Sequence, residues 1–95
     1  MRYLWQGQAF QTRLSLIGAF QAENVAVAAG LAIAAGDAPE AVLGVLPRLT
    51  GVRGRMQLAA TRRNGAAVYV DYAHTPDAIA TALRALRPHV MGRII

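Results

Sequence analysis

Ala66-Ala67-Val68-Tyr69-Val70-Asp71-Tyr72-Ala73-His74-Thr75-Pro76-Asp77 is the stretch that decides the fold class of this chain. Its first five residues are apolar on both faces, which is typical of a strand buried inside an α/β sheet. Thr75 is a favourable helix N-cap, Pro76 suits the first helical position, and Asp77 complements the helix dipole. We therefore predict a strand that ends near Asp71 and a helix that follows Thr75.

The flanking residues extend this unit in both directions. Upstream, the sequence predicts a β-hairpin with strands at 56–61 and 66–71, joined by a turn at 62–65 with Asn64-Gly65 at its tip. Downstream, the helix should end at Pro88, and its predicted buried stripe consists of Ile79, Leu83 and Leu86. Residues 92–95 read as the beginning of another strand, so this half has the pattern of an incomplete strand–helix–strand unit.

The N-terminal half begins with an alternating segment. Residues 8–17 place Phe10, Thr12, Leu14 and Leu16 on one face, which predicts a half-buried strand. A helix is predicted from about 21 to 35, and because it is apolar nearly all round we expect burial on most sides. Gly36 is a suitable C-terminal stop for that helix.

A second helix is predicted immediately afterwards. Asp37 and Glu40 have the spacing of a capping box, and Pro47 ends the helix. Its apolar face consists of Val42, Leu43, Val45 and Leu46. Residues 47–55 have turn composition with two glycines, which makes them the candidate linker or domain boundary.

The composition restricts the classes of function. There are ten basic residues, all of them arginine, and the formal net charge is +5. The tightest group is Arg53, Arg55, Arg62 and Arg63, which fits either solvated faces or an anion site. The chain has no cysteine, which excludes disulfides and thiolate chemistry and fits a cytoplasmic location. The longest apolar stretch, 25–35, is shorter than the roughly 20 residues that span a bilayer.

The turn from the strand to the helix at 71–77 is the most informative candidate site. Ligands of open α/β sheets bind outside the carboxyl ends of the strands, where Asp71 is placed. Its carboxylate can accept hydrogen bonds from both hydroxyls of a ribose, and Tyr72 and His74 can stack on or bond to a nucleotide. The alternative is that Asp71 only caps a turn and His74 is an ordinary surface residue.

Two further residues are candidates, each with a plain alternative. Arg55 follows a glycine turn and can reach phosphate with its guanidinium fork, or it is a solvated linker residue. Asn24 stands near the beginning of an apolar helix and can either read an adenine edge or cap the helix.

Other chemistries lack their residues. Two histidines without cysteine give no metal-ligand cluster, and Ser15, the only serine, has no nearby histidine for a triad. A phosphate loop of the GxxxxGK[ST] type needs a lysine, which this sequence does not contain.

Three segments together resemble the Mur ligase family. Gly18-Ala19-Phe20-Gln21-Ala22-Glu23-Asn24-Val25-Ala26-Val27-Ala28-Ala29 is similar to the pattern G-x-F-N-x-x-N-x-x-A-A. Val52-Arg53-Gly54-Arg55-Met56-Gln57 is similar to V-x-G-R-M-E, and residues 71–77 match D-Y-A-H-T-P-D of the branch that adds the third residue to UDP-N-acetylmuramoyl-dipeptide. The three motifs keep their order and spacing over roughly residues 7–95, although Gln21 and Gln57 depart from the usual asparagine and glutamate.

The resemblance implies a fold, a site and an activity. It implies a partial α/β structure in which residues 1–52 end the central ATP-binding domain and 53–95 begin a Rossmann-like C-terminal domain. Asn24 would contact the adenine, Arg55 would approach the nucleotide from the linker, and Asp71 would hold the ribose. Tyr72 and His74 would lie nearby.

The implied reaction is an ATP-dependent amide ligation of peptidoglycan precursor synthesis that proceeds through an acyl-phosphate. Its substrates would be UDP-N-acetylmuramoyl-dipeptide and either diaminopimelate or lysine, with Mg²⁺ held by residues outside this segment. We expect no catalytic residue in these 95 residues and no activity of the chain alone. The alternatives are a related ligase of the folylpolyglutamate synthetase type, a small basic nucleic-acid-binding module, and a docking fragment without a site.

Overall fold

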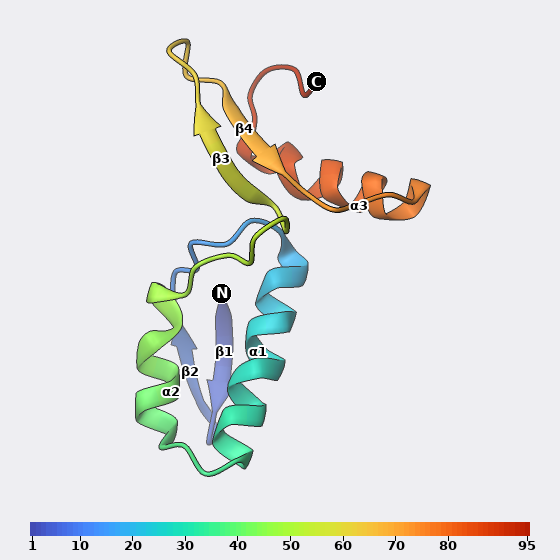
Figure 1. The fold of residues 1–95 in the computed structure, drawn as a ribbon. Helices are drawn as coiled ribbons and strands as arrows, with labels where there is room; N and C mark the ends of the chain where they lie inside the picture. Colours follow the sequence, from blue (N-terminus) through green and yellow to red (C-terminus); the bar gives the residue numbers. More distant parts are fainter. The chain divides into compact units, whose positions relative to one another are not determined.

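The computed structural model describes residues 1–95, which divide into two units, Met1–Thr50 and Gly51–Ile95 (Figure 1). Each unit contains one two-stranded antiparallel sheet and its own helices. The mixed α/β composition agrees with the predicted class. Both sheets are antiparallel hairpins, and the Rossmann-like character expected for the complete domain stays a prediction.

The sheet of the first unit is a tight hairpin. Strands β1 (Arg2–Trp5) and β2 (Gln8–Gln11) pair with Tyr3 opposite Phe10. Gln6 and Gly7 join them, and both have positive φ angles, 49° and 78°, as a turn that matches the strand twist requires.

The predicted strand at 8–17 is wrong in length, and β1 was not predicted at all. The ladder of β1 and β2 ends at Gln11, and one further pair of backbone bonds, both 2.9 Å long, joins Thr12 to Met1; no strand pairs with the residues after Thr12. The predicted alternation persists for three of its four residues: Thr12, Leu14 and Leu16 are half-buried, and the residues between them are exposed. The fourth, Phe10, is exposed.

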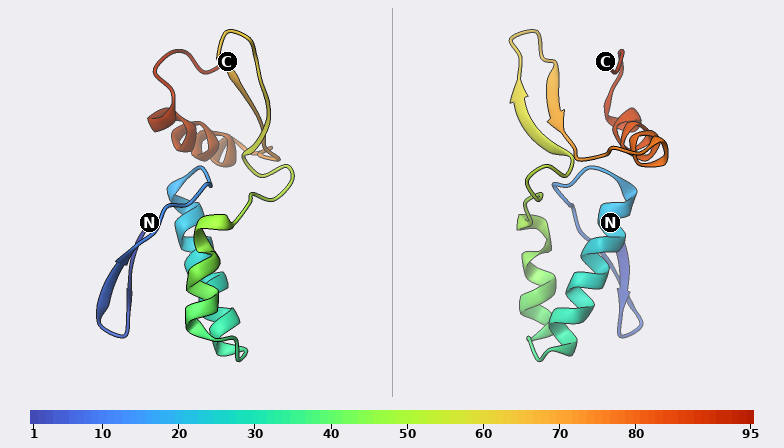
Figure 2. Two further views of the ribbon diagram at one scale, coloured as in Figure 1. Left: turned by 90° about the vertical axis from the view of Figure 1, so that its left-hand side faces the viewer. Right: turned by 45° about the vertical axis from the view of Figure 1, so that its right-hand side comes forward.

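Both predicted helices of the first unit are present: α1 spans Ala19–Ala34 and α2 spans Pro39–Val45, followed by a short 3-10 turn, η1, at Leu46–Arg48. They lie side by side and antiparallel in all views (Figures 1 and 2). Gly36, with φ +113°, ends α1 as predicted, because its N–H donates to Ile33 and the next N–H donates to Ala32.

The predicted capping box of α2 is wrong. The N-cap is Ala38, without a side-chain cap, and Pro39 takes the first helical position. Asp37 cannot begin α2 because its N–H donates to the carbonyl of Ala32 and so belongs to the end of α1. Glu40 does lie in the first turn, where its charge complements the dipole.

The core of the first unit is small. Val25, Ala29 and Leu46 are its buried residues. Half-buried side chains from the hairpin, α2 and the connecting segments pack against them: Met1, Tyr3, Leu14, Leu16, Val42, Leu43 and Leu49.

Helix α1 is therefore buried along one line only, and the prediction of burial on most sides is wrong. Val25 and Ala29 are one helical turn apart and face the core. On the other side Val27 and Leu31 are 63% and 67% exposed, because no second layer of this unit covers that face.

The second unit contains the predicted hairpin, β3 (Gln57–Thr61) and β4 (Ala67–Val70). A bulge interrupts the register between Leu58 and Ala60. At the tip, the Arg62 N–H donates to Ala66, and Gly65, with φ +85°, supplies the left-handed turn position. Strand β4 is mostly exposed rather than buried as predicted, because it pairs with β3 alone; Tyr69 is its one half-buried residue.

Helix α3 spans Pro76–Leu86 and begins as predicted. The Thr75 hydroxyl accepts from the Ala78 N–H at 3.2 Å. The predicted buried stripe is wrong, since Ile79 and Leu83 are each 46% exposed and α3 has no buried residue. A 3-10 turn, η2, follows at Arg87–His89 and contains Pro88.

The strand predicted for residues 92–95 is also absent. No other strand of the second unit adds to β3 or β4, so these residues lack a hydrogen-bonding partner in the sheet. The Arg87 guanidinium donates instead to the carbonyls of Val90 and Gly92, at 2.7 and 2.5 Å, and holds the chain close to the end of α3.

None of the helices has both the length and the apolar character required to cross a membrane.

The core of the first unit predicts that alanine substitutions at two leucines have very different effects on stability. Leu46 is 3% exposed, so Leu46→Ala should cost about 2–5 kcal/mol, as for other buried leucines. A core of this size contributes about the same amount to the free energy of unfolding, so the first unit should lose its cooperative unfolding transition. Leu31→Ala, the matched control at 67% exposure, should change stability by less than about 0.5 kcal/mol. Urea unfolding of the 95-residue chain, followed by circular dichroism, makes the comparison; equal effects of the two changes would contradict the assigned core.

Candidate functional site

Asp71 is held at the end of β4 by both of its carboxylate oxygens. Oδ2 accepts from the Met56 N–H at 2.9 Å, and Oδ1 accepts from the Ala73 N–H at 2.8 Å. The first bond ties together residues that are 15 positions apart, and the second closes a local turn. The structure thus shows the turn-capping role that was one alternative for Asp71.

This role leaves the carboxylate able to bind something else. A carboxylate offers about four lone-pair positions, and the two backbone N–H groups occupy one on each oxygen of Asp71. The residue is exposed to solvent. Asp71 is therefore a fixed acceptor that can still receive two hydrogen bonds.

A tight turn at residues 52–57 lies against Asp71. The Arg55 N–H donates to Val52 at 3.0 Å and closes the turn. The Gly54 N–H donates to Oε1 of Gln57 at 2.9 Å, and the Gly54 carbonyl accepts from the Tyr72 N–H at 2.9 Å. We name this the linker turn.

The linker turn contains two left-handed residues. Gly54 has φ +74°, which glycine adopts without penalty, and Met56 has φ +48°, which is uncommon for a residue with a Cβ. Met56 is also the buried residue of the second unit, at 7% exposure. Its burial and its bond to Asp71 hold it in this conformation.

Arg55 lies between these two residues, on the exposed surface of the linker turn. Because the linker turn is bonded to Asp71 and Tyr72, the structure brings Arg55 to the same end of the hairpin as the residues that follow β4. The linker turn and the segment at 71–77 therefore lie together in the second unit, whereas Asn24 belongs to the first unit.

Tyr72 and His74 complete this end of the hairpin. Tyr72 is 69% exposed, and its ring centroid lies 5.1 Å from that of His74 at an angle of 60°. His74 Nδ1 lies 3.0 Å from the Tyr72 carbonyl. Because a carbonyl only accepts, Nδ1 must carry the proton of this bond, and in the neutral ring Nε2 is left as an acceptor.

Asn24 is the sixth residue of α1, and it is exposed. It does not cap the helix, since the N-cap is Gly18 and no side chain bonds there, so the capping alternative is wrong. It shares the outer face of α1 with Val27 and Leu31, at helical spacings of three and seven.

The four arginines that are close in sequence do not form one cluster. Arg53 and Arg55 precede β3, whereas Arg62 and Arg63 follow it at the hairpin tip (Figure 1). A five-residue strand separates the pairs by roughly 17 Å. The four arginines therefore form two separate pairs and not the single basic group that their spacing in the sequence suggested.

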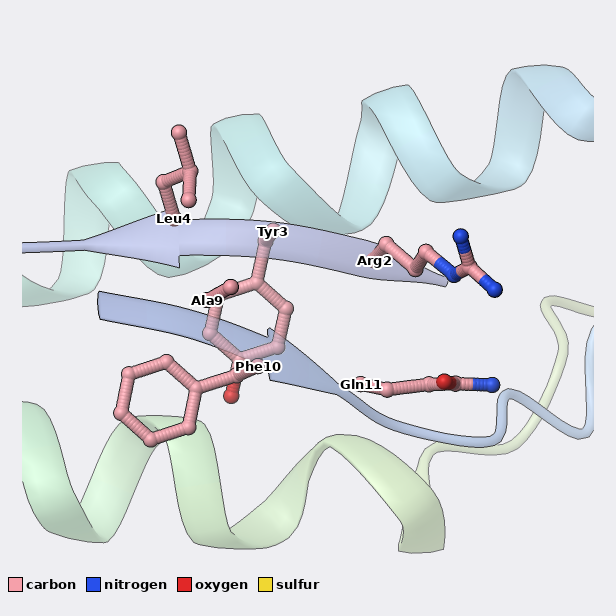
Figure 3. Close-up of a pocket in the computed structure, with 6 residues that line it drawn as sticks. All are labelled: Arg2, Tyr3, Leu4, Ala9, Phe10 and Gln11. Atoms are coloured by element: carbon pink, nitrogen blue, oxygen red, sulfur yellow. The ribbon is translucent and has the colours of Figure 1, made fainter. Parts of the chain in front are cut away.

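A shallow hollow that the sequence did not predict lies on the hairpin of the first unit. It is lined by Arg2, Tyr3, Leu4, Ala9, Phe10 and Gln11. Tyr3 and Phe10 stack there with centroids 5.5 Å apart, and Leu4 points away from them (Figure 3). We therefore interpret the hollow as part of the hairpin surface beside the stacked rings. The structure contains no group of three or more histidine, cysteine, aspartate or glutamate residues that could hold a metal ion.

Sequence comparison places these residues in a family. Residues 54–95 match the profile of the Mur ligase glutamate ligase domain. Over 90 residues the chain is 51% identical to the UDP-N-acetylmuramoyl-L-alanyl-D-glutamate–2,6-diaminopimelate ligase of Caulobacter vibrioides, covering 95% of this chain and 18% of that protein. The ligases of the same name from Zymomonas mobilis and a Chelativorans species are 48% and 44% identical, over 92% and 95% of this chain and 18% and 19% of theirs.

No solved structure matches the chain. The chain spans about a fifth of the length of these curated relatives, and the similarity runs through both of its units. Because the chain is 44–51% identical to these three ligases over nearly its whole length and residues 54–95 match the family profile, it belongs to the Mur ligase family.

Proposed function

We propose that this chain contributes the adenine–ribose side of the ATP site in a peptidoglycan-precursor ligase. The ligase would join 2,6-diaminopimelate to UDP-N-acetylmuramoyl-L-alanyl-D-glutamate, the substrates named for the relatives. The observation that carries the proposal is the Asp71 carboxylate, which two backbone N–H groups fix while leaving two acceptor positions exposed.

The geometry of Asp71 suits the two hydroxyls of a ribose. Vicinal hydroxyls are donors on adjacent carbons, and a carboxylate presents two acceptor oxygens at a similar spacing. Fixing the carboxylate before the ligand arrives reduces the entropy lost on binding. The exposed Tyr72 ring beside it offers a surface for stacking, and the neutral form of His74 offers an acceptor at Nε2.

Arg55 and Asn24 have roles that rest on the family resemblance. Arg55 carries a permanent charge and a bidentate fork, which suit a nucleotide phosphate. It lies at the same end of the hairpin as Asp71, which supports a shared ligand. Asn24 presents both a donor and an acceptor on an exposed helix face, which an adenine edge requires.

The proposed reaction has two steps. A substrate carboxylate oxygen attacks the γ-phosphorus of ATP, which breaks the bond to ADP and gives an acyl-phosphate. The incoming amine then attacks the acyl carbon, forms the amide and releases inorganic phosphate. Mg²⁺ would neutralise the phosphate charges when bound, and its ligands are expected outside these residues.

The ribose role of Asp71 predicts a loss of discrimination between nucleotides. In the ligase that carries this segment, Asp71→Ala should raise the KM for ATP about 10- to 100-fold, since bonds to charged acceptors contribute about 1.5–3 kcal/mol. The wild type should prefer ATP to 2′-deoxy-ATP, and the variant should not. Asp77→Ala is the matched control, because Asp77 is an exposed aspartate in the first turn of α3. A variant that kept the preference for ATP would refute the proposed role.

The 95-residue chain alone should show neither ATP hydrolysis nor ligation, because it contains no lysine-bearing phosphate loop. Release of phosphate from ATP by the purified chain, measured against a buffer blank, checks this. Turnover that disappeared in Asp71→Ala would show that the chain holds catalytic groups of its own. The proposal that it contributes only the adenine–ribose side of the ATP site would then be wrong.

The separated arginines predict weak and unselective contact with nucleic acid. Binding that depends on several phosphates needs a contiguous basic surface, and here two pairs lie at opposite ends of β3. Electrophoretic mobility of a short RNA duplex in about 50 mM salt should not shift with the 95-residue chain. A shift lost in Arg62→Ala/Arg63→Ala would favour the nucleic-acid-binding alternative instead.

A further inference from the structure

The linker turn fixes the backbone on both sides of Arg55. On one side, the N–H of Gly54 bonds to the Gln57 side chain and its carbonyl bonds to Tyr72. On the other side, the N–H of Met56 bonds to Asp71. The direction in which the Arg55 side chain leaves the surface is therefore set by three hydrogen bonds that its own side chain does not make.

Gln57 connects the sheet with the linker turn. It is the first residue of β3, where it pairs with Val70, so its backbone is part of the hairpin ladder. Its side chain folds back, and Oε1 accepts from the Gly54 N–H at 2.9 Å. The residue is half-buried, so water replaces this acceptor only in part if the amide oxygen is removed.

The linker turn contains one residue in a costly conformation. Met56, which the bond to Asp71 holds, is left-handed at φ +48°, and a non-glycine residue in that region costs roughly 1–2 kcal/mol. The Gln57 bond to Gly54 is a second support of the same turn. If one hydrogen bond of the linker turn is removed, the backbone can relax toward φ and ψ values of lower energy. Relaxation would reorient Arg55, which lies between Gly54 and Met56.

We propose that Gln57 is a positioning residue for Arg55 in nucleotide binding, an inference that rests on the proposed function. Gln57 acts through its acceptor oxygen, by holding the Gly54 N–H. Glutamine and glutamate both supply this oxygen. Methionine has a similar length and shape and lacks the oxygen.

The test compares Gln57→Met with Gln57→Glu in the ligase that carries this segment. Gln57→Met should raise the KM for ATP roughly fivefold, the equivalent of one ordinary hydrogen bond, and leave the KM for diaminopimelate unchanged. Gln57→Glu should restore the wild-type value. Gln8→Met is the control, because Gln8 is an exposed glutamine that also begins a strand.

A double-mutant cycle with Arg55 separates positioning from general destabilisation. If Gln57 acts through Arg55, Gln57→Met should have no further effect on the KM for ATP in the Arg55→Ala background. Additive effects would overturn the inference. If Arg55→Ala itself left the KM for ATP unchanged, the proposed function would fail first, so the two failures are distinguishable.

A direct measurement keeps the inference testable if the variants lose activity for other reasons. Amide hydrogen exchange at Gly54 should be faster in Gln57→Met than in the wild type, and as slow as in the wild type in Gln57→Glu. Equal exchange in all three proteins would show that the side-chain bond does not hold the turn, and the inference would be wrong.

Discussion

The interaction on which the second unit depends is the pair of bonds that Asp71 accepts from Met56 and Ala73. One carboxylate joins the beginning of β3 to the turn that leads into α3, so the hairpin is closed at the end opposite its tip. A short two-stranded hairpin is marginal by itself, and side-chain bonds across its open end add stability that the ladder lacks. The same bonds decide where Arg55, Tyr72 and His74 lie, which makes the structural and the proposed functional roles of Asp71 inseparable.

Local features of the fold could be predicted from the sequence. The Thr75 cap, the Asn64-Gly65 turn and the Gly36 helix stop each depend on a few adjacent residues, and each is present in the structure. Their physical basis is short-range backbone geometry, which residue identity largely determines. The register of the second hairpin, including the bulge between Leu58 and Ala60, could not be predicted from the sequence and is known only from the structure.

Burial could not be predicted in the same way. The outer face of α1, the strand β4 and the stripe of α3 are apolar in sequence and exposed in the structure. An apolar pattern indicates that an element can be buried, but whether it is buried depends on what packs against it. For the site, the sequence identified Asp71, Tyr72, His74 and Arg55 as candidates. It missed Met56 and Gln57, because their contributions are bonds made by backbone and amide groups whose direction depends on φ and ψ.

The two hairpins have a practical consequence for the handling of the protein. Each sheet has only two strands, so every strand carries one row of backbone N–H and C=O groups that faces no neighbour. Such rows are templates for strand addition between molecules, and β4 combines a free edge with exposed Val68 and Val70. Concentrated preparations of this chain should therefore favour intermolecular sheet growth, and a charged substitution on the outer edge of β4 is the rational first step toward a variant that stays monomeric at the concentrations spectroscopy requires.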